Sequence, residues 1–217
     1  MTQEETAKAE TTKAALIRAG LELFGRNGFD ATSTRQIAAK AGANISAISY
    51  YFGGKENLRL ACAEHVAEKM AAVSQMALTA PDGIGPQEAA EMLGQIFSGM
   101  LQALLLQPDG ERISQFILRE ITQPGPVLDA VYPRFVEPVH QSLCRLWASA
   151  TGKDAQSEDV KLGVFSAIGQ VVYFRIAREL VSRRMDWGDP GPDQVADINT
   201  VVQNNLRAIL RTDSKRN

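Results

Sequence analysis

Cysteine is almost absent from this sequence of 217 residues, which has only Cys62 and Cys144. Two cysteines cannot form the disulfide framework that stabilises small secreted domains. The segment from residue 2 to residue 13 is polar and carries charges of both signs, so we expect neither a signal peptide nor a transit peptide. Both features are typical of proteins from a reducing compartment, and we expect this protein to be cytoplasmic.

Long hydrophobic runs are also missing. A mostly apolar stretch without charges lies between Lys161 and Arg175, but it is too short to span a bilayer and contains Ser166 and Gln170. We therefore expect no contact with a membrane. A hydrophobic content of 45% with a net charge of -2 excludes a disordered chain, and 17 glycines and 9 prolines are too few for a collagen-like one.

The common catalytic motifs are absent too. The sequence has no P-loop, no GxGxxG, no HExxH and no GxSxG. Cys62 and His65 are three residues apart, but Cys62 belongs to an apolar stripe and is better explained as a core residue, as is Cys144. We therefore expect no enzyme, no metal site and no cofactor.

Positive charge is concentrated near the N-terminus. Residues 1–60 contain eight Lys/Arg and six Asp/Glu, whereas residues 61–217 contain 15 and 19. Within residues 31–60, four bases accompany one acid, Glu56. This distribution indicates a small basic head that meets a polyanion, and a solvated charged face explains it equally well.

Apolar residues recur every three to four positions along almost the whole chain, and no run alternates for long as a strand would. We therefore predict an all-α fold of about nine helices. After the first four helices, the predicted ranges are about 87–107, 110–122, 126–150 (kinked at Pro133 and Pro138), 155–184 and 193–211.

The first part of the chain has the pattern of a helix-turn-helix. A helical stripe ends at Gly28, and Ser33 and Gln36 have the spacing of a capping box at the start of a second helix. Gly42 stops that helix, and Asn44 can cap a third one over 45–51. Helices this short are not stable alone, so both must pack on their neighbours. This is the geometry of the motif whose second helix enters the DNA major groove.

Breaks in the pattern predict three parts. A helix-turn-helix head covers residues 10–55, a connecting helix covers 56–80, and a helical body covers 81–212. The loop that ends at Gly85-Pro86 is the clearest boundary between them.

The head resembles the DNA-binding domain of the TetR family of transcriptional regulators. Residues 32–42 (TSTRQIAAKAG) resemble the first half of its motif, and residues 43–58 (ANISAISYYFGGKENL) resemble the second half. Upstream, Leu21-x-Leu23-Phe24-x-x-x-Gly28-Phe29 fits as well, so the resemblance covers about residues 12–60. The segments AGAN and YYFGGKE resemble the CecR-like branch of that family.

The resemblance implies that Ile45, Ser46 and Tyr50 face the bases and that Lys55 binds phosphate at the start of the fourth helix. Ile45 and Ala47 offer only methyl groups, which suit thymine, so we expect sparse, shape-dependent base readout. Ordinary packing and solvated charges are the alternative for these side chains. The predicted DNA-binding residues are Thr34, Arg35, Ile45, Ser46, Ala47, Ser49, Tyr50, Tyr51 and Lys55.

The body gathers aromatic residues: eight of the fourteen in the chain lie between Phe97 and Phe174. With a few polar groups among them, they fit either an apolar pocket for a small molecule or an ordinary helical core. The resemblance favours an effector cavity within residues 87–185. We also expect Arg119 or Glu120 to be half-buried and paired, for example with Arg175 or Glu179. The predicted ligand-binding residues are Phe97, Met100, Phe116, Arg119, Glu120, Phe135, Trp147, Gln170 and Tyr173.

The last two predicted helices have apolar stripes that suit an oligomer interface or an internal core. One stripe contains Gly163, Ala167 and Val171, and another contains Phe165, Gly169 and Tyr173. The final helix carries a broad stripe made of Val195, Ile198, Val201, Val202, Leu206, Ile209 and Leu210. A homodimer is expected, because two-fold pairing presents two recognition helices to a near-palindromic site.

Together these observations predict a ligand-responsive repressor that binds a palindromic operator as a homodimer and is released by a small-molecule effector. Two other classes stay open. One is a helical protein-interaction module without sequence-specific DNA binding. The other is a small-molecule enzyme that has kept a vestigial head.

Overall fold

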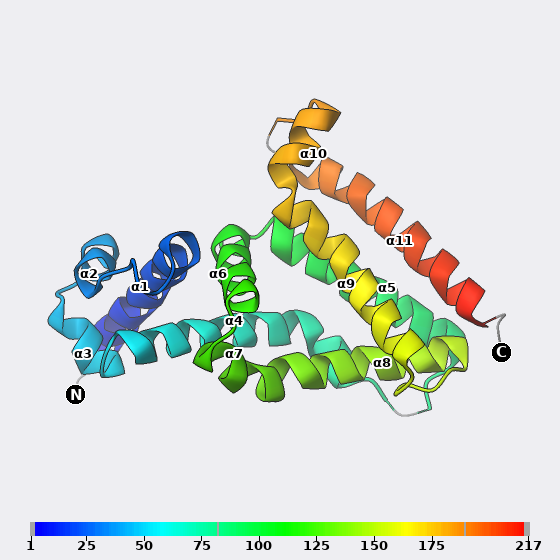
Figure 1. The fold of residues 1–217 in the computed structure, drawn as a ribbon, viewed down its shortest axis with the longest axis horizontal. Coiled ribbons are helices and arrows are strands. Elements are labelled where there is room, and N and C mark those ends of the chain that lie inside the picture. The colour runs from blue at the N-terminus through cyan, green and yellow to red at the C-terminus, as the bar shows by residue number, and fades with distance from the viewer. Residues whose placement is uncertain (1–2, 82, 189, 215–217) are drawn as a thin grey trace. The chain divides into compact units, whose positions relative to one another are not determined.

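The computed structural model describes residues 3–81, 83–188 and 190–214 (Figure 1). In these residues the chain forms eleven α-helices, one π-helical turn and no β-strand, which confirms the all-α prediction. The helices are α1 (Gln3–Asn27), α2 (Thr34–Ala41), α3 (Ser46–Phe52), α4 (Lys55–Leu78), α5 (Pro86–Leu105), α6 (Gly110–Thr122), α7 (Pro126–Val131), α8 (Glu137–Thr151), α9 (Glu158–Ile176), α10 (Arg178–Met185) and α11 (Pro192–Ser214), with the π-helical turn η1 (Tyr132–Val136).

Two helices that the sequence predicts as single are divided in the structure, which explains why the count exceeds nine. The segment predicted over 126–150 consists of α7, η1 and α8. Its π-helical turn contains Pro133, which has no N–H to continue the α-helical ladder. The segment predicted over 155–184 bends by 72° between α9 and α10, at Ala177. Neither glycine nor proline marks that break in the sequence.

The described residues divide into two compact units. The first contains the residues up to Lys69 together with Arg112–Tyr132, and the second contains Met70–Glu111 and the residues from Pro133 onward. Most of α6 and all of α7 therefore belong with the helix-turn-helix, although the sequence predicts them in the body.

The first unit has its own apolar core. Leu16 of α1, Ile37 of α2 and Ile48 of α3 are at most 1% exposed, and Leu58 of α4 is fully buried. The helices α1 and α4 approach closely at Gly20, where a Cβ atom would lie 2.8 Å from the sulfur of Cys62. A larger residue at this position would push the two helices apart.

In the second unit α5, α8, α9 and α11 pack around a shared core (Figure 1). Trp147 is fully buried, and a Cβ atom on Gly163 would lie 2.9 Å from its ring. Ala167 and Val171 belong to the same core, so this predicted stripe packs within the protomer. The final helix likewise turns most of its stripe inward, through Val195, Ile198, Val202, Leu206 and Leu210.

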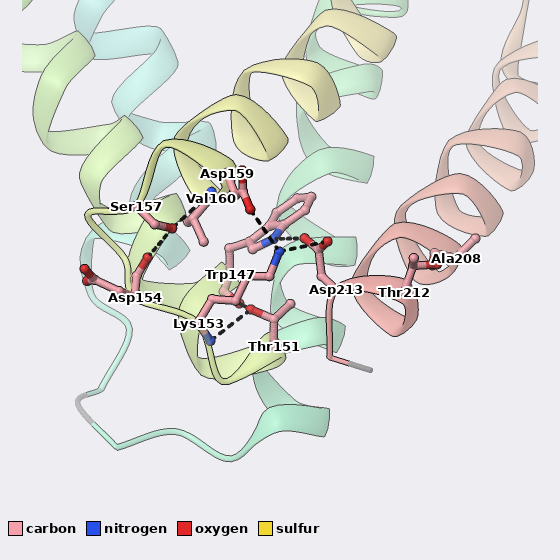
Figure 2. A network of polar contacts seen from close by, with 10 residues as sticks. All are labelled: Trp147, Thr151, Lys153, Asp154, Ser157, Asp159, Val160, Ala208, Thr212 and Asp213. Atoms are coloured by element: carbon pink, nitrogen blue, oxygen red, sulfur yellow. Dashed lines mark hydrogen bonds and ion pairs between the residues drawn. The ribbon is translucent and has the colours of Figure 1, made fainter. Parts of the chain in front are cut away.

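A polar network fastens the end of α11 to the loop after α8 (Figure 2). The indole N–H of Trp147 donates to Asp213 Oδ2 at 3.2 Å, and Lys153 Nζ lies 3.0 Å from Asp213 Oδ1. Lys153 also lies 3.8 Å from Asp159, whose side chain is 80% exposed. The Asp213 carboxylate thus accepts from two nearly buried donors, the indole of Trp147 and the ammonium group of Lys153. The spacing of residues within one helix cannot predict such a contact.

Among the described residues, no helix by itself has the length and apolar character needed to cross a membrane. Two sharply bent pairs, α5 with α6 and α9 with α10, reach that length and composition jointly.

We expect Asp213→Ala to destabilise the second unit, because it removes the acceptor of a buried indole and the partner of a nearly buried ammonium group. Unpaired groups of this kind cost about 1–3 kcal/mol. Asp159→Ala is the matched control, and losing such an exposed contact should cost less than about 1 kcal/mol. Urea unfolding followed by circular dichroism measures both changes. Equal stability of the two variants would contradict the role given to Asp213.

Candidate nucleic-acid interface

The capping box predicted at the start of α2 is present. Ser33 Oγ accepts a hydrogen bond from the backbone N–H of Gln36 at 3.2 Å, and Gln36 Oε1 accepts one from the backbone N–H of Ser33 at 2.8 Å. The helix ends at Gly42, whose φ of +62° is in the left-handed region that favours glycine. These two ends fix the length of α2 and turn the chain toward α3.

The seven-residue helix α3 begins and ends one residue later than predicted. Asn44 Oδ1 accepts hydrogen bonds from both the backbone N–H of Ser46, at 3.0 Å, and its hydroxyl, at 2.9 Å. Ile48 is 1% exposed and anchors the helix, whereas Ile45 is 47% exposed and Tyr50 is 79% exposed. Inward anchoring through Ile48 therefore leaves a face of α3 open to solvent.

All nine residues predicted to bind DNA lie in the first unit, on α2, on α3, in the turn between them and at the start of α4. The exposed members are Arg35, Ile45, Ser46, Ser49 and Tyr50. The half-buried members are Thr34, Ala47, Tyr51 and Lys55. The rings of the two tyrosines meet edge to face, with centroids 4.9 Å apart. The structure thus brings these residues together, and their contact with DNA stays a prediction.

Ion pairs divide the four basic residues of residues 31–60 into two groups. Lys40 lies 2.9 Å from Glu22, and Arg59 pairs with a carboxylate of α6. Arg35 and Lys55 form no ion pair with any residue that the structure describes. The uncompensated positive charge of residues 31–60 therefore belongs to two of the residues predicted to bind DNA.

Glu22 is a buried carboxylate that joins three helices. It pairs with Arg26 on α1 and Lys40 on α2, each at 2.9 Å, and with Arg112 on α6 at 3.4 Å. The hydrogen bond from Lys40 lowers the pKa of the Glu22 carboxyl below its ordinary value of 4.5 and outweighs the opposing effect of burial. Glu22 therefore stays ionised and holds α2 against α1.

A second buried carboxylate joins α6 to α4. Arg59 Nε donates to Glu120 Oε1 at 2.9 Å, and a terminal nitrogen of Arg59 donates to Oε2 at 2.8 Å. The prediction that Arg119 or Glu120 is paired away from solvent is confirmed for Glu120, which is 6% exposed and so more deeply buried than the half-buried state expected. The predicted partner is wrong, because Arg175 pairs with Glu111 instead.

Arg119 fastens α6 to the end of α1. Its guanidinium donates to the carbonyl oxygens of Gly25 and Arg26, each at 3.1 Å. A Cβ atom on Gly25 would lie 3.0 Å from the backbone nitrogen of Phe116, so the two helices nearly touch there. In the sequence Arg119 is only a charge after an apolar run, and nothing local identifies carbonyl groups 94 and 93 residues away as its partners.

The residues predicted to bind a ligand lie in three different environments. Phe116, Arg119 and Glu120 belong to the first unit, with the contacts just described. Phe97 and Trp147 are core residues of the second unit, Met100 packs against that core, and Phe135 is buried in η1. Gln170 and Tyr173 line an open groove. The nine are thus divided between two units, and their contact with an effector stays a prediction.

The groove lies between α9 and α11 and has a volume of about 380 Å³. It is lined by Gly169, Gln170, Tyr173, Phe174, Val201, Val202 and Asn205. Large exposed apolar side chains continue along α9 beside it at helical spacing, namely Leu162, Phe165, Tyr173 and Ile176. The second predicted stripe, Phe165, Gly169 and Tyr173, lies on this face and, unlike the first stripe, faces outward.

The two cysteines are buried and reduced. Burial raises the pKa of the Cys62 thiol, and the Glu120 carboxylate raises it further, so Cys62 is a poor nucleophile. His140 stacks on Phe165 with ring centroids 4.1 Å apart, and its Nδ1 lies 3.6 Å from the Cys144 sulfur. No group of three or more potential metal ligands occurs within the described parts of the chain.

Two family profiles match this chain. The profile described as "Bacterial regulatory proteins, tetR family" matches residues 16–62, which contain the helix-turn-helix. The profile described as "HTH-type transcriptional dual regulator CecR, C-terminal domain" matches residues 89–212. Together they cover most of both units.

Individual relatives agree with these matches. The transcriptional dual regulator CecR of Shigella flexneri is 36% identical over 97% of this chain and 96% of its own length. A transcriptional repressor of Mycobacterium tuberculosis is 29% identical over 75% of this chain and 90% of its own length. A TetR-like regulator from Rhodococcus sp. RHA1 has the same fold, with a TM-score of 0.63 at 20% identity over 90% of this chain and 96% of that one.

We expect Glu22→Gln to destabilise the head at neutral pH and to lose that effect in acid. The folded-state pKa of Glu22 is lowered, so its contribution is fully present above about pH 4.5 and is lost as the pH falls through the lower folded value. Urea unfolding of wild type and variant at a series of pH values measures the difference. The exposed Glu64, changed to Gln, is the control. A difference that stayed constant down to pH 3 would contradict this role.

Proposed function

Since the chain belongs to the TetR family of bacterial transcriptional regulators, in its CecR branch, we propose that it is a ligand-responsive repressor. It binds a palindromic operator in the cytoplasm as a homodimer, and a small-molecule effector releases it. The observation that carries the proposal is the exposed face of α3, where Tyr50 is 79% exposed while Ile48 anchors the helix from within. Arg35 and Lys55 have no ion-pair partner among the residues that the structure describes, and a solvent-facing recognition helix with such cations in its unit suits a DNA groove.

The contacts with DNA follow from the chemistry of that face. Arg35 and Lys55 supply the positive charge that phosphates attract, while Thr34, Ala47, Ser49 and Tyr51 lie near the backbone of the duplex. The exposed side chain of Ile45 suits a thymine methyl group.

Ser46 has a preferred role in base readout. The backbone N–H of Ser46 can only donate, so the oxygen of the Asn44 amide must face it, and the Ser46 hydroxyl must then donate to the same oxygen. The lone pairs of that hydroxyl are left to accept. They suit the amino group of adenine or cytosine in the major groove. Tyr50, next along the same face, can donate or accept.

A second copy of this chain is the proposed occupant of the groove between α9 and α11. Leu162, Phe165, Tyr173 and Ile176 are each more than half exposed, and Gly169 lies among them. Their spacing places them on one face of α9, which would be a costly surface to leave in water. Gln170 and Tyr173 are therefore reassigned from effector binding to dimerisation.

The effector is proposed to bind in the C-terminal body, where Phe97, Met100, Phe135 and Trp147 suit a largely apolar molecule. Phe97 and Trp147 are at most 1% exposed, so binding requires the core around them to open. By linkage, an effector that favours a conformation unsuited to the operator lowers DNA affinity, and DNA lowers effector affinity by the same factor. The helix α4, whose residues belong to both units, is the proposed transmitter.

Selection of bound duplexes from a random pool tests the function directly. We expect one enriched palindromic site, with affinity that falls steeply as salt is added. Weak binding without sequence preference would instead favour a helical interaction module.

Tyr50→Ala and Lys55→Ala are both expected to weaken binding to the selected duplex without unfolding the head. Lys55→Ala should reduce affinity similarly on all sequences and lower the salt slope by about 0.9 for each lost phosphate contact, whereas Tyr50→Ala should reduce specificity. Fluorescence anisotropy over a range of salt concentrations measures both. The exposed Arg18 on α1, changed to Ala, is the control for loss of one positive charge. Wild-type affinity in Tyr50→Ala and Lys55→Ala would remove the support for this site.

Tyr173→Glu is expected to convert the homodimer into a monomer, because it places a charge in an apolar contact between copies. Analytical ultracentrifugation measures the oligomeric state of the variant. Tyr132→Glu is the matched control, since Tyr132 is 48% exposed and Tyr173 is 52% exposed, but Tyr132 lies outside the groove. A Tyr173→Glu protein that stays dimeric would place the interface elsewhere.

A further inference from the structure

The ring of Phe29, in the loop after α1, lies beside two cations of α4. Lys55 Nζ is 4.1 Å from the centroid of the ring, and the guanidinium carbon of Arg59 is 4.9 Å from it. Both distances are within the range of a cation–π interaction. Lys55 and Arg59 are four residues apart, so they lie on the same side of α4. Phe29 is itself held by Phe24, a buried residue of α1, with ring centroids 5.8 Å apart.

The two cations differ in how their charge is balanced. The guanidinium of Arg59 is bound through two hydrogen bonds by Glu120, which is nearly buried. Lys55 has no carboxylate partner within the described residues. Two unbalanced cations beside one ring would repel each other, so the carboxylate of Glu120 allows Phe29 to hold the ammonium group of Lys55 in place.

We propose that Phe29 is a positioning residue for the phosphate contact of Lys55, and that the Arg59–Glu120 ion pair makes this positioning possible. The ring attracts the ammonium group and limits the freedom of a flexible four-carbon side chain. The N–H groups that point away from the ring are left to donate to a phosphate oxygen. Less conformational entropy is then lost when DNA binds. The inference rests on the proposed DNA contact of Lys55.

This arrangement also links α6 to the DNA-binding face. Glu120 is on α6, Arg59 and Lys55 are on α4, and Phe29 precedes α2. If a displacement of α6 withdraws Glu120, the positive charge of Arg59 beside Phe29 is no longer neutralised. That charge then repels the ammonium group of Lys55 from the same ring. Operator affinity therefore depends on Glu120, although Glu120 is not among the proposed DNA contacts.

The test is a double-mutant cycle on the full-length protein, with a labelled duplex obtained by the selection described above as the probe. Phe29→Leu keeps an apolar side chain but removes the aromatic ring, and it should weaken binding about two- to five-fold for each bound head. Phe29→Tyr keeps the ring and should restore binding. In the Lys55→Ala background, Phe29→Leu should cause no further loss. Thermal unfolding of each variant shows that the head is folded.

The Arg59–Glu120 pair is tested in the same assay. Glu120→Gln should weaken binding when Lys55 is present and have no effect in the Lys55→Ala background. Adding Arg59→Met to Glu120→Gln removes the unbalanced cation, and this double variant should recover affinity.

The outcomes separate the inference from the proposed function. If the Lys55→Ala variant binds the duplex with wild-type affinity, both the proposed phosphate contact of Lys55 and the positioning role of Phe29 are wrong. If Lys55→Ala weakens binding while Phe29→Leu costs the same factor with and without Lys55, the phosphate contact stands and the positioning role is wrong. A Phe29→Tyr variant that binds no better than Phe29→Leu would also overturn it.

Discussion

A seven-residue helix is too short to be stable in water, and the DNA-binding face depends on how α3 meets that constraint. Buried Ile48 anchors it, the Asn44 amide caps its start, and Gly53 ends it with a φ of +76°. These contacts involve the inner side and the two ends of α3. The residues on its outer side are therefore not needed to stabilise the helix. Ile45 and Tyr50 can therefore be exposed without loss of the fold.

Buried carboxylates pair with two of the four cations of residues 31–60. Glu22 neutralises Lys40, and Glu120 neutralises Arg59, while Arg35 and Lys55 are left without a counter-charge in the described residues. Structural cations and ligand-binding cations look the same in a sequence. Ion pairs in the tertiary structure distinguish them, because a buried carboxylate requires a cationic partner and binds the cation that it meets. The same carboxylates attach α6 to the helix-turn-helix, so a helix predicted in the body belongs with the head.

In the second unit, the two faces of α9 have different roles. Gly163, Ala167 and Val171 turn inward, where the absence of a side chain at position 163 makes room for the ring of Trp147. Phe165 and Tyr173 turn outward beside the groove. Both stripes have the spacing of an apolar helix face, so periodicity alone predicts two buried faces. Only the position of α5, α8 and α11 shows which one is already covered.

The sequence by itself determined the helical fold, the helix-turn-helix with its capping box and glycine turns, and the grouping of the nine DNA-binding candidates on one short segment. These features depend on residues within a few positions of each other, so local spacing and capping chemistry suffice to predict them. The tertiary structure alone decided the partners of Glu120 and Arg119, the break at Ala177, and the placement of Phe29 beside Lys55 and Arg59. Those features join residues 26 to 94 positions apart or depend on the neighbours that a helix packs against. The sequence pattern identifies residues that can form ion pairs and ring contacts. The packing of the helices determines which of these residues contact one another.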